Sequence, residues 1–410
     1  MAFPFPLLIG AMSAAAPMMA FDLGNAPVRE GHIKVEAGSP YQPGGHGYEP
    51  GATERGFLFS VAVPEGNYRV TVQLGDRRRA GVTTVKAESR RLMLSGIRTR
   101  AGALETRSFI VNVRSAALPA PPENAPGGRA VRLNPREQGS FTWDEKLTLE
   151  FLGAPRVSAI SINPADVPTV YLVGDSTVTD QRFEPAASWG QMLTAMLDDG
   201  VAVANHAESG QTLKSFLTDL RLDKALSRMR AGDWLFIQFG HNDQKAQWPQ
   251  TYADPAHGYP AYLRAYIAEA RRRGAQPVLV TSPERRNFAA DGRITDTLAD
   301  YVAAMRKLAA EERVPLIDLN TASKTIYQAL GPTHAARAFN DGGADKTHHN
   351  NYGAWLLARA VAEGIRGQVP DLAPHLAHDL PAFGAAQPPL PERIAIPASL
   401  ARSAARPAGN

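Results

Sequence analysis

One stretch decides the fold of the second half of this chain, and it reads Thr169-Val170-Tyr171-Leu172-Val173-Gly174-Asp175-Ser176-Thr177-Val178-Thr179-Asp180. Its first five residues are apolar or β-branched, which is typical of a buried strand, and the glycine that follows marks the end of that strand. Between residues 189 and 197, apolar side chains recur at i, i+3, i+4, i+7 and i+8, the stripe of an amphipathic helix. The stretch therefore predicts a strand, a loop that carries a serine, and then a helix.

The same alternation continues toward the C-terminus. Strand-like runs lie at 201–204, 234–239, 277–281 and 315–319, and helical stripes lie at 263–270, 298–308 and 352–364. Alternating strands and helices predict an α/β fold with a parallel sheet and helices on both faces, in a flavodoxin-like three-layer sandwich over residues 166–370. In such sheets the chemistry lies in loops beyond the carboxyl ends of the strands.

The preceding segment, residues 21–165, has a different texture. Residues 56–63 and 68–74 alternate with period two around Pro64-Glu65-Gly66-Asn67, which predicts a strand, a tight turn and a strand. Further strands fit 108–113, 146–152 and 157–162, and residues 118–129 form a long loop rich in proline and glycine. The pattern predicts an all-β sandwich or jelly-roll domain.

Length and composition limit the remaining possibilities. A chain of 410 residues exceeds one ordinary core, and 44% hydrophobic with 20% charged residues is typical of folded domains. The net charge is only +4, and the two dense basic runs, at 77–79 and 271–273, fit solvated faces, so we expect no nucleic-acid partner. The absence of cysteine excludes a thiol nucleophile and a disulfide framework.

The two ends differ from the domains. Residues 1–20 are apolar and resemble a signal peptide or leader, although no Lys or Arg precedes the apolar run, so we expect a secreted or periplasmic protein. No other stretch approaches the length of a membrane span, so we expect no membrane partner. Residues 371–410 form a Pro/Ala-rich tail without periodicity from about Pro381, typical of a linker or a disordered segment.

Three loops at predicted strand ends carry candidate groups. Ser176 follows the first strand, where a hydroxyl suits a nucleophile, although a serine also serves as a helix N-cap. Asn242 lies in Gly240-His241-Asn242-Asp243 after the third strand, where its amide would donate to an oxyanion, or where Asn-Asp would simply close an Asx-turn. Gly210 follows the second strand and would bring its N–H close to a substrate.

A fourth candidate group is Asp345-Lys346-Thr347-His348, ahead of the last helix. Residues three apart on a helical turn share a face, so the Asp345 carboxylate would reach one nitrogen of the His348 imidazole and leave the other for a nucleophile. A metal site built from His241, Asp243, Asp345 and His348 is the alternative, but no pair of histidines has ligand spacing.

The four groups together resemble the SGNH, or GDSL, hydrolase family. Its blocks correspond to Gly174-Asp175-Ser176, Gly210, Gly240-His241-Asn242-Asp243 and Asp345-Lys346-Thr347-His348. Residues 167–368 are similar to rhamnogalacturonan acetylesterases, on account of Gly-Asp-Ser-Thr, Gly-His-Asn-Asp and the segment from Asn205 to Phe216. The β-domain is similar to the galactose-binding-like modules of bacterial members.

The resemblance implies a function and a role for each matched residue. Ser176 is the implied nucleophile, His348 the base and Asp345 its partner, while Ser176, Gly210 and Asn242 form the oxyanion hole. No cofactor and no metal are implied. The implied activity is a carbohydrate esterase that removes acetyl groups from pectic rhamnogalacturonan, so the partner would be acetylated plant cell-wall polysaccharide.

Several alternatives stay open from the sequence alone. The substrate would instead be xylan, another acetylated glycan or a short-chain lipid ester, or the chain would be a carbohydrate-binding protein with an inactive esterase domain. An α/β-hydrolase is disfavoured because no Gly-x-Ser-x-Gly elbow occurs. One departure from the family stands out: Glu208-Ser209 precedes Gly210, where an apolar residue and a second glycine are more usual.

Overall fold

In the computed structural model, which describes residues 19–23, 28–124, 126–405 and 407, the apolar run that ends at Gly174 forms strand β11 (Thr169–Gly174). It lies inside a parallel five-stranded sheet of order β12-β11-β13-β14-β15. The neighbouring strands are β12 (Ala202–Asn205), β13 (Trp234–Gln238), β14 (Gln276–Val280) and β15 (Leu316–Ile317). This 2-1-3-4-5 order is that of flavodoxin-like sheets, which confirms the predicted fold class.

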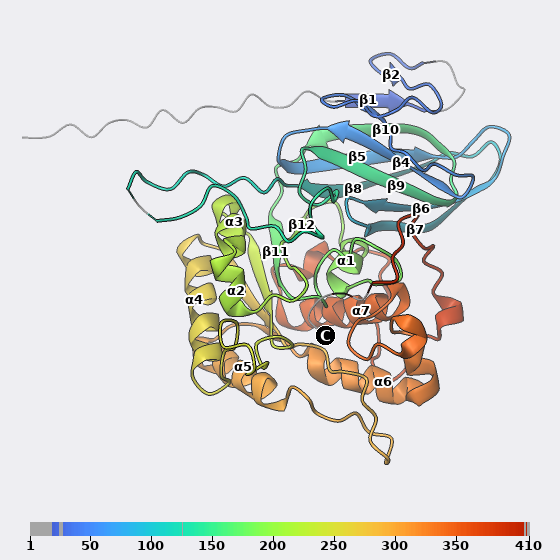
Figure 1. Cartoon of the computed structure of the whole chain (residues 1–410). Helices are drawn as coiled ribbons and strands as arrows, with labels where there is room; N and C mark the ends of the chain where they lie inside the picture. Colours follow the sequence, from blue (N-terminus) through green and yellow to red (C-terminus); the bar gives the residue numbers. More distant parts are fainter. Residues whose placement is uncertain (1–18, 24–27, 125, 406, 408–410) are drawn as a thin grey trace, which may run out of the picture.

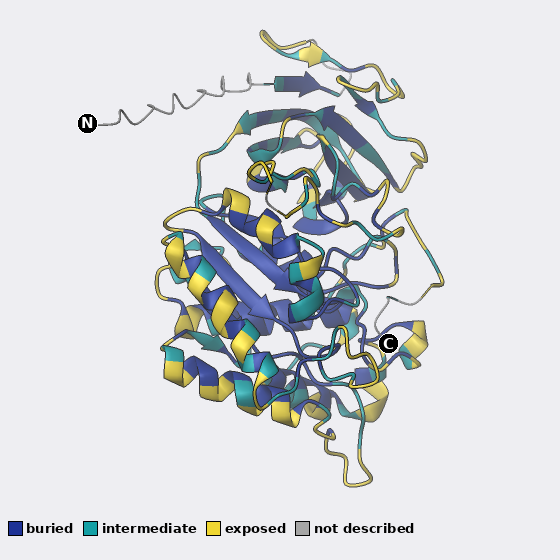
Figure 2. Ribbon diagram, turned by 60° about the vertical axis from the view of Figure 1, so that its left-hand side comes forward, coloured by how far each residue is buried: buried dark blue, intermediate teal, exposed yellow. Residues whose placement is uncertain are grey.

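Helices cover both faces of this sheet because the side chains of each strand alternate between two apolar cores. Val170 and Leu172 pack into one core, and Tyr171 and Val173 pack into the other. The first core is closed by α1 (Trp189–Leu193), η1 (Thr194–Met196), α6 (Leu319–Ala336) and α7 (Asn351–Gln368). The second is closed by α2 (Leu213–Thr218), α3 (Arg221–Arg228), α4 (Gly258–Arg272) and α5 (Ala299–Glu312). Figure 2 shows the buried sheet between helices whose exposed residues face outward.

The N-terminal half is a β-sandwich that lies against one end of the α/β domain (Figure 1). One sheet has the order β2-β1-β10-β5-β8 and the other β3-β4-β9-β6-β7, and all pairs are antiparallel except β1 with β2. The strands are β1 (Met19–Asp22), β2 (Ile33–Lys34), β3 (His46–Tyr48), β4 (Gly56–Ala62), β5 (Gly66–Leu74), β6 (Gly81–Ala87), β7 (Arg91–Thr99), β8 (Glu105–Val113), β9 (Lys146–Ala154) and β10 (Val157–Pro164). The all-β class predicted for this segment is confirmed.

The two strands predicted on either side of the turn near Pro64 do not pair with each other. Both strands exist, but β4 pairs with β3 and β9 in one sheet, whereas β5 pairs with β10 and β8 in the other. The turn after β4 therefore crosses from sheet to sheet. Alternation identified the buried faces correctly, since Val70 and Val72 of β5 are fully buried, but a buried face does not reveal which strand lies alongside.

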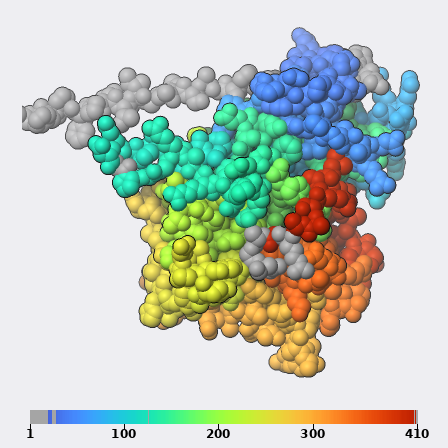
Figure 3. Space-filling view, in the orientation of Figure 1, coloured from blue at the N-terminus to red at the C-terminus, as the bar shows by residue number. Residues whose placement is uncertain are grey.

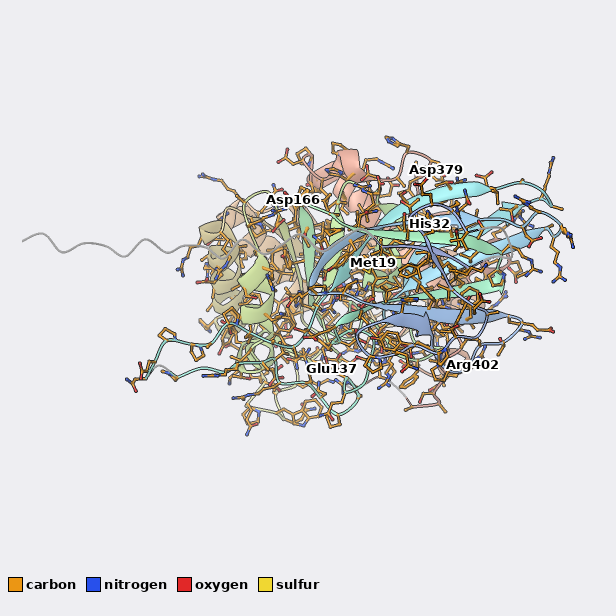
Figure 4. All side chains as sticks on the ribbon, turned by 90° about the horizontal axis from the view of Figure 1, so that it is seen from above. Met19, His32, Glu137, Asp166, Asp379 and Arg402 are labelled. Atoms are coloured by element: carbon orange, nitrogen blue, oxygen red, sulfur yellow. The ribbon has the colours of Figure 1, made fainter. Side chains whose placement is uncertain are left out.

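The two ends of the chain also differ from expectation. Met19 and Ala20, which the sequence assigned to a leader, lie in β1, paired with Ile162 and Ser161 of β10; Figure 4 labels Met19 in a view onto this end. Residues 1–18 lie outside the described residues.

The tail from about Pro381 was predicted to be a linker or disordered, and instead its described residues pack on both domains. Short 3-10 turns occur in the tail at η3 (Ala373–His375) and η4 (Pro391–Arg393), and η2 (Asp341–Gly343) precedes α7. Ser399 is buried, its N–H donates to Glu184 (2.8 Å) and its hydroxyl donates to Glu150 of β9 (2.6 Å). Figure 3 shows this segment, in red, between the sandwich and the helices. Because its partners are distant in sequence, no local hydrophobic periodicity predicts the contact.

Among the described helices, none is both long and apolar enough to cross a membrane.

Candidate active site

Ser176 lies two residues beyond the end of β11, in a turn that only glycine allows to form. A Cβ on Gly174 would stand 2.7 Å from the carbonyl oxygen of Gln238 on β13, too close for any other residue. The next residue, Asp175, accepts hydrogen bonds from the N–H (2.9 Å) and hydroxyl (2.8 Å) of Thr177. These contacts fix the turn in which Ser176, only 3% exposed, is held.

His348 and Asp345 belong to the C-terminal part of the sequence of this domain, and His348 contacts Ser176. The Nε2 atom of His348 lies 2.9 Å from the Ser176 hydroxyl, and Nδ1 lies 2.8 Å from a carboxylate oxygen of Asp345. The other Asp345 oxygen accepts the N–H groups of Thr347 (2.8 Å) and His348 (2.9 Å). A carboxylate only accepts, so the proton of the imidazole lies on Nδ1 and Nε2 faces the hydroxyl as an acceptor.

The local structure around this pair is not the helical turn that the sequence predicted. Helix α7 begins only at Asn351, after the N-cap Asn350, and residues 345–348 form a loop. The bond from the N–H of Thr347 to the side chain of Asp345 makes this loop an Asx-turn, which brings positions i and i+3 together by a different route. The predicted contact is present, and its predicted cause was wrong.

The charge of Asp345 is strongly favoured in this setting. Burial raises the pKa of the carboxyl, but the hydrogen bond and charge of His348 and the two backbone N–H groups outweigh burial and hold it well below its usual range. Asp345 is therefore ionised throughout the physiological range.

His349 faces away from Ser176. Its Nε2 atom lies 2.7 Å from the Tyr327 hydroxyl, and its ring centroid lies 4.4 Å from that of Phe339. Burial, together with the neighbouring charge of His348, lowers the pKa of His349 to about 3, so the ring stays neutral inside the core. The structure thus separates two adjacent histidines into one that contacts Ser176 and one that packs.

The three candidate oxyanion donors emerge from the carboxyl ends of neighbouring strands, and their loops are bonded to each other. The Gln181 amide donates to the carbonyl of Ser176 (2.8 Å) and to the hydroxyl of Ser209 (3.4 Å), beside Gly210. The Asn242 amide donates to the carbonyl of Gln211 (3.1 Å). Gly210 has a φ of +81°, a conformation that favours glycine.

The orientation of the Asn242 amide is set from both sides. The Lys245 ammonium donates to the amide oxygen of Asn242 (3.0 Å). One N–H of the Asn242 amide donates to the carbonyl of Gln211, which leaves the second N–H of that amide for another acceptor. Within the described part of the chain, neither the N–H of Ser176 nor that of Gly210 donates to a protein group. All three donors are thus present in loops that are tied together.

The remaining residues of the metal alternative are dispersed into other contacts. His241 Nδ1 lies 3.2 Å from Asp175, and Asp243 accepts the N–H of Leu213 (2.9 Å). Burial raises the pKa of Asp243 to about 7. No cluster of three or more such side chains spaced to hold a metal ion occurs among the residues that the structure describes.

Sequence reasoning missed the residues that bind the loops to each other. Gln181 is one, and Gln238 is another, since its side chain joins the Trp189 indole (2.7 Å) to the hydroxyl of Thr177 (2.6 Å). Both are glutamines that flank the quoted blocks without belonging to them. Only the position of Gln238 at the last residue of β13 is a usable signal, because strand ends of a parallel sheet meet at one edge.

Comparison with known proteins identifies the family of the α/β domain. The profile of the GDSL-like Lipase/Acylhydrolase family matches residues 172–356. Rhamnogalacturonan acetylesterase RhgT of Bacillus subtilis (strain 168) is 40% identical over 220 residues, which cover 50% of this chain and 93% of that protein. The probable rhamnogalacturonan acetylesterase YesY of the same organism is 38% identical over 200 residues, covering 48% of this chain and 92% of that protein.

One relative extends over both domains. The uncharacterized esterase YxiM of B. subtilis is 28% identical over 387 residues, covering 87% of this chain and 93% of that protein. Its crystal structure aligns with a TM-score of 0.48 at 26% identity, covering 86% of this chain and 98% of that chain. On the strength of the RhgT match and the family profile, this chain belongs to the GDSL-like lipase/acylhydrolase family and is a carboxylic ester hydrolase.

Proposed function

We propose that this enzyme removes acetyl groups from pectic rhamnogalacturonan through an acyl-enzyme intermediate on Ser176. The observation that carries the proposal is the chain of contacts from the Ser176 hydroxyl through His348 to Asp345. The acetyl group and the pectic substrate are supported by the two relatives that are named rhamnogalacturonan acetylesterases.

The geometry supports an order of proton transfers. Ser176 attacks the ester carbonyl while Nε2 of His348 takes the hydroxyl proton, and the imidazolium so formed is stabilised by the ionised Asp345. Nε2 then returns the proton to the sugar oxygen as the ester bond breaks and the acetyl group stays on Ser176. Water, deprotonated by the same nitrogen, releases acetate and restores the serine.

The negative charge that develops on the carbonyl oxygen needs donors fixed in advance. The backbone N–H groups of Ser176 and Gly210 and the side-chain N–H of Asn242 fit this role because each is held in a loop bonded to the others. A donor that is already oriented requires no reorganisation during the reaction, which lowers the barrier.

A secreted or periplasmic location belongs to the same proposal, because a cell-wall polysaccharide lies outside the cytoplasm. Since Met19 is the first residue of β1, a leader that ends before it would leave the sandwich intact. N-terminal sequencing of protein recovered from the culture medium or periplasm tests this, and an N-terminus at Met1 in those fractions would contradict it.

The test of the function is acetate release from acetylated pectin, xylan and mannan and from a small chromogenic acetate, with Ser176→Ala as the control. We expect the highest kcat/KM on acetylated rhamnogalacturonan and no turnover by Ser176→Ala. A clear preference for acetylated xylan would retain the chemistry and refute the substrate, whereas no release from any ester would refute both.

A further inference from the structure

The loop between β13 and α4 leaves the candidate oxyanion donor Asn242 through consecutive tight turns. The carbonyl of Asn242 accepts the N–H of Lys245 (3.1 Å), and the carbonyl of Lys245 accepts the N–H of Trp248 (2.9 Å). The carbonyl of Trp248 accepts the N–H groups of Thr251 (3.0 Å) and Tyr252 (2.9 Å). Each of these bonds closes a turn, so the backbone of the loop is fixed from Asn242 to Tyr252.

Three side chains of this loop contact one another in a row. The Nζ atom of Lys245 lies 3.0 Å from the amide oxygen of Asn242 and 4.9 Å from the centroid of the Trp248 ring. Asn242 is 2% exposed, Lys245 is half-buried and Trp248 is 48% exposed. The row therefore leads from a buried amide beside Ser176 to the surface of the molecule.

The Lys245 ammonium selects the orientation of the Asn242 amide. An ammonium group only donates hydrogen bonds, so the end of the amide that faces it is the oxygen. If the amide were flipped, its NH2 group would face the ammonium, and two donors would oppose each other. The NH2 group is held instead on the side of the Gln211 carbonyl, with one N–H available to a substrate.

The same ammonium strengthens the N–H as a donor. A cation bonded to the oxygen of an amide draws electron density from the nitrogen, and linked hydrogen bonds polarise one another in this way. Burial and the charge of Arg285 lower the pKa of Lys245, while the charge of Asp175 opposes that shift. A charge that is partly removed from water acts more strongly on a neighbouring group than a fully solvated charge does.

Trp248 has a surface position that core packing does not explain. Of the five tryptophans of the chain, it alone is exposed, and the other four are buried or half-buried. Its ring gives the Lys245 ammonium a cation–π contact. A lysine side chain is long and flexible, so this contact restricts it to the position above the Asn242 amide.

We propose that Lys245 is a positioning residue for ester hydrolysis: its ammonium, held by the Trp248 ring, orients and polarises the Asn242 amide that binds the oxyanion. The inference rests on the proposed function, in which Asn242 is an oxyanion donor. Lys245 lies two residues beyond the block Gly240-His241-Asn242-Asp243, so it extends the site outside the motif that identified it.

The test measures kcat and KM on p-nitrophenyl acetate for Lys245→Met, Lys245→Arg and Trp248→Ala. Lys214→Met is the matched control, because this lysine of α2 donates to the carbonyl of Pro249 in the same loop (3.1 Å). We expect Lys245→Met to lower kcat about tenfold with little change in KM, less than the roughly 10²–10³ that loss of a donor costs. Lys245→Arg, which keeps the charge, should retain most of kcat, and Trp248→Ala should lose less than Lys245→Met. Lys214→Met should change neither constant.

Double variants separate positioning from every other role of Lys245. Once Asn242 is replaced by alanine, no amide is left to orient, so adding Lys245→Met or Trp248→Ala should not lower kcat further. Urea unfolding checks that each variant is folded, and Trp248→Ala, at the surface, gives a second comparison if Lys245→Met is not.

Several results would overturn the inference: normal kcat in Lys245→Met, the same loss with and without Asn242, a loss confined to KM, or an equal loss in Lys214→Met. Normal kcat in Asn242→Ala alone would refute the oxyanion role and this inference with it. A preference for another acetyl ester would refute only the pectic substrate of the proposed function.

Discussion

The Ser176 hydroxyl is small, almost fully buried and bonded to His348, so its removal should affect chemistry more than folding. We expect Ser176→Ala to abolish ester hydrolysis because the covalent route needs the oxygen, and to leave the unfolding midpoint close to that of the unmodified enzyme. Acetate release and urea unfolding check the two statements. Turnover near the normal rate would remove Ser176 from the role of nucleophile.

The adjacent histidines differ in environment, which makes them a matched pair. We expect His348→Ala to lower kcat by a factor of about 10³ or more, since only oxyanion binding remains. His349→Ala should keep substantial kcat but lose about 2–5 kcal/mol of stability, as other large buried side chains do on truncation. Its ring fills space beside Tyr327 and Phe339. Steady-state kinetics and urea unfolding of both variants test these two expectations. A large loss of kcat in His349→Ala and not in His348→Ala would assign the role of base to His349.

Asn242 should act on the transition state rather than on substrate binding. We expect Asn242→Ala to lower kcat by roughly 10²–10³, the usual effect of losing one oxyanion donor, with little change in KM. Its amide is held between Lys245 and Gln211, so the donor is oriented before substrate arrives. Steady-state kinetics on a small acetate give the answer, and a change confined to KM would make Asn242 a substrate-binding residue.

At the scale of elements, the turn between β6 and β7 bonds the sandwich to the α/β domain. Arg90 donates to the carbonyls of Gln181 (3.0 Å) and Ala186 (2.7 Å), and the carbonyl of Ser89 accepts from Gln191 of α1 (2.7 Å). Gln181 is the residue that bonds Ser176, so this turn supports the nucleophile loop from behind.

This turn also predicts a pH dependence of stability. Burial, reinforced by the charge of Asp144 and opposed by Arg91 and Arg114, raises the pKa of Glu88 to about 8, whereas the unfolded chain releases this proton near the ordinary value of 4.5. The folded state therefore holds the extra proton, and its stability falls as pH rises from about 4.5 to about 8. We expect Glu88→Gln, which cannot titrate, to flatten that fall in urea unfolding at pH 5, 6.5 and 8. An unchanged slope would mean that Glu88 is ionised in the fold.

At the scale of the whole molecule, buried ion pairs join the two domains. Arg90 pairs with Glu184 at 2.6 Å and Arg91 with Asp180 at 3.1 Å, and all four side chains are at most 5% exposed. Buried charges that lose their partners are strongly destabilising, so the α/β domain of this chain is adapted to its sandwich.

Deletion of the sandwich therefore has a defined outcome. We expect residues 166–410 alone to lose activity on a small acetate as well as on polymer, because Asp180 and Glu184 are left without their arginines. Acetate release from both substrates and the unfolding midpoint of the shortened chain test this. Full activity on the small acetate with a loss confined to polymer would mean that the sandwich only binds glycan.

The sequence by itself determined the fold class and the choice of candidate residues. Period-two and helical patterns report which face of each element is buried, so the sandwich and the parallel sheet were both predicted. Helices α2 and α3 were not predicted because they are short, and α6 because Gly331 and Pro332 interrupt it. Ser176, Asp345 and His348 were selected from their motifs, and the structure places them in contact, while their catalytic roles stay predictions.

Only the tertiary structure decided which elements lie side by side. It separated β4 from β5, drew the tail across both domains and placed Arg136 against Glu208. It also replaced the expected helical turn at Asp345 by an Asx-turn, and it turned His349 into the core. The physical reason is the same throughout: a local pattern encodes burial and backbone preference, whereas an ion pair or a strand pairing depends on residues tens to hundreds of positions away, which meet only when the chain has folded.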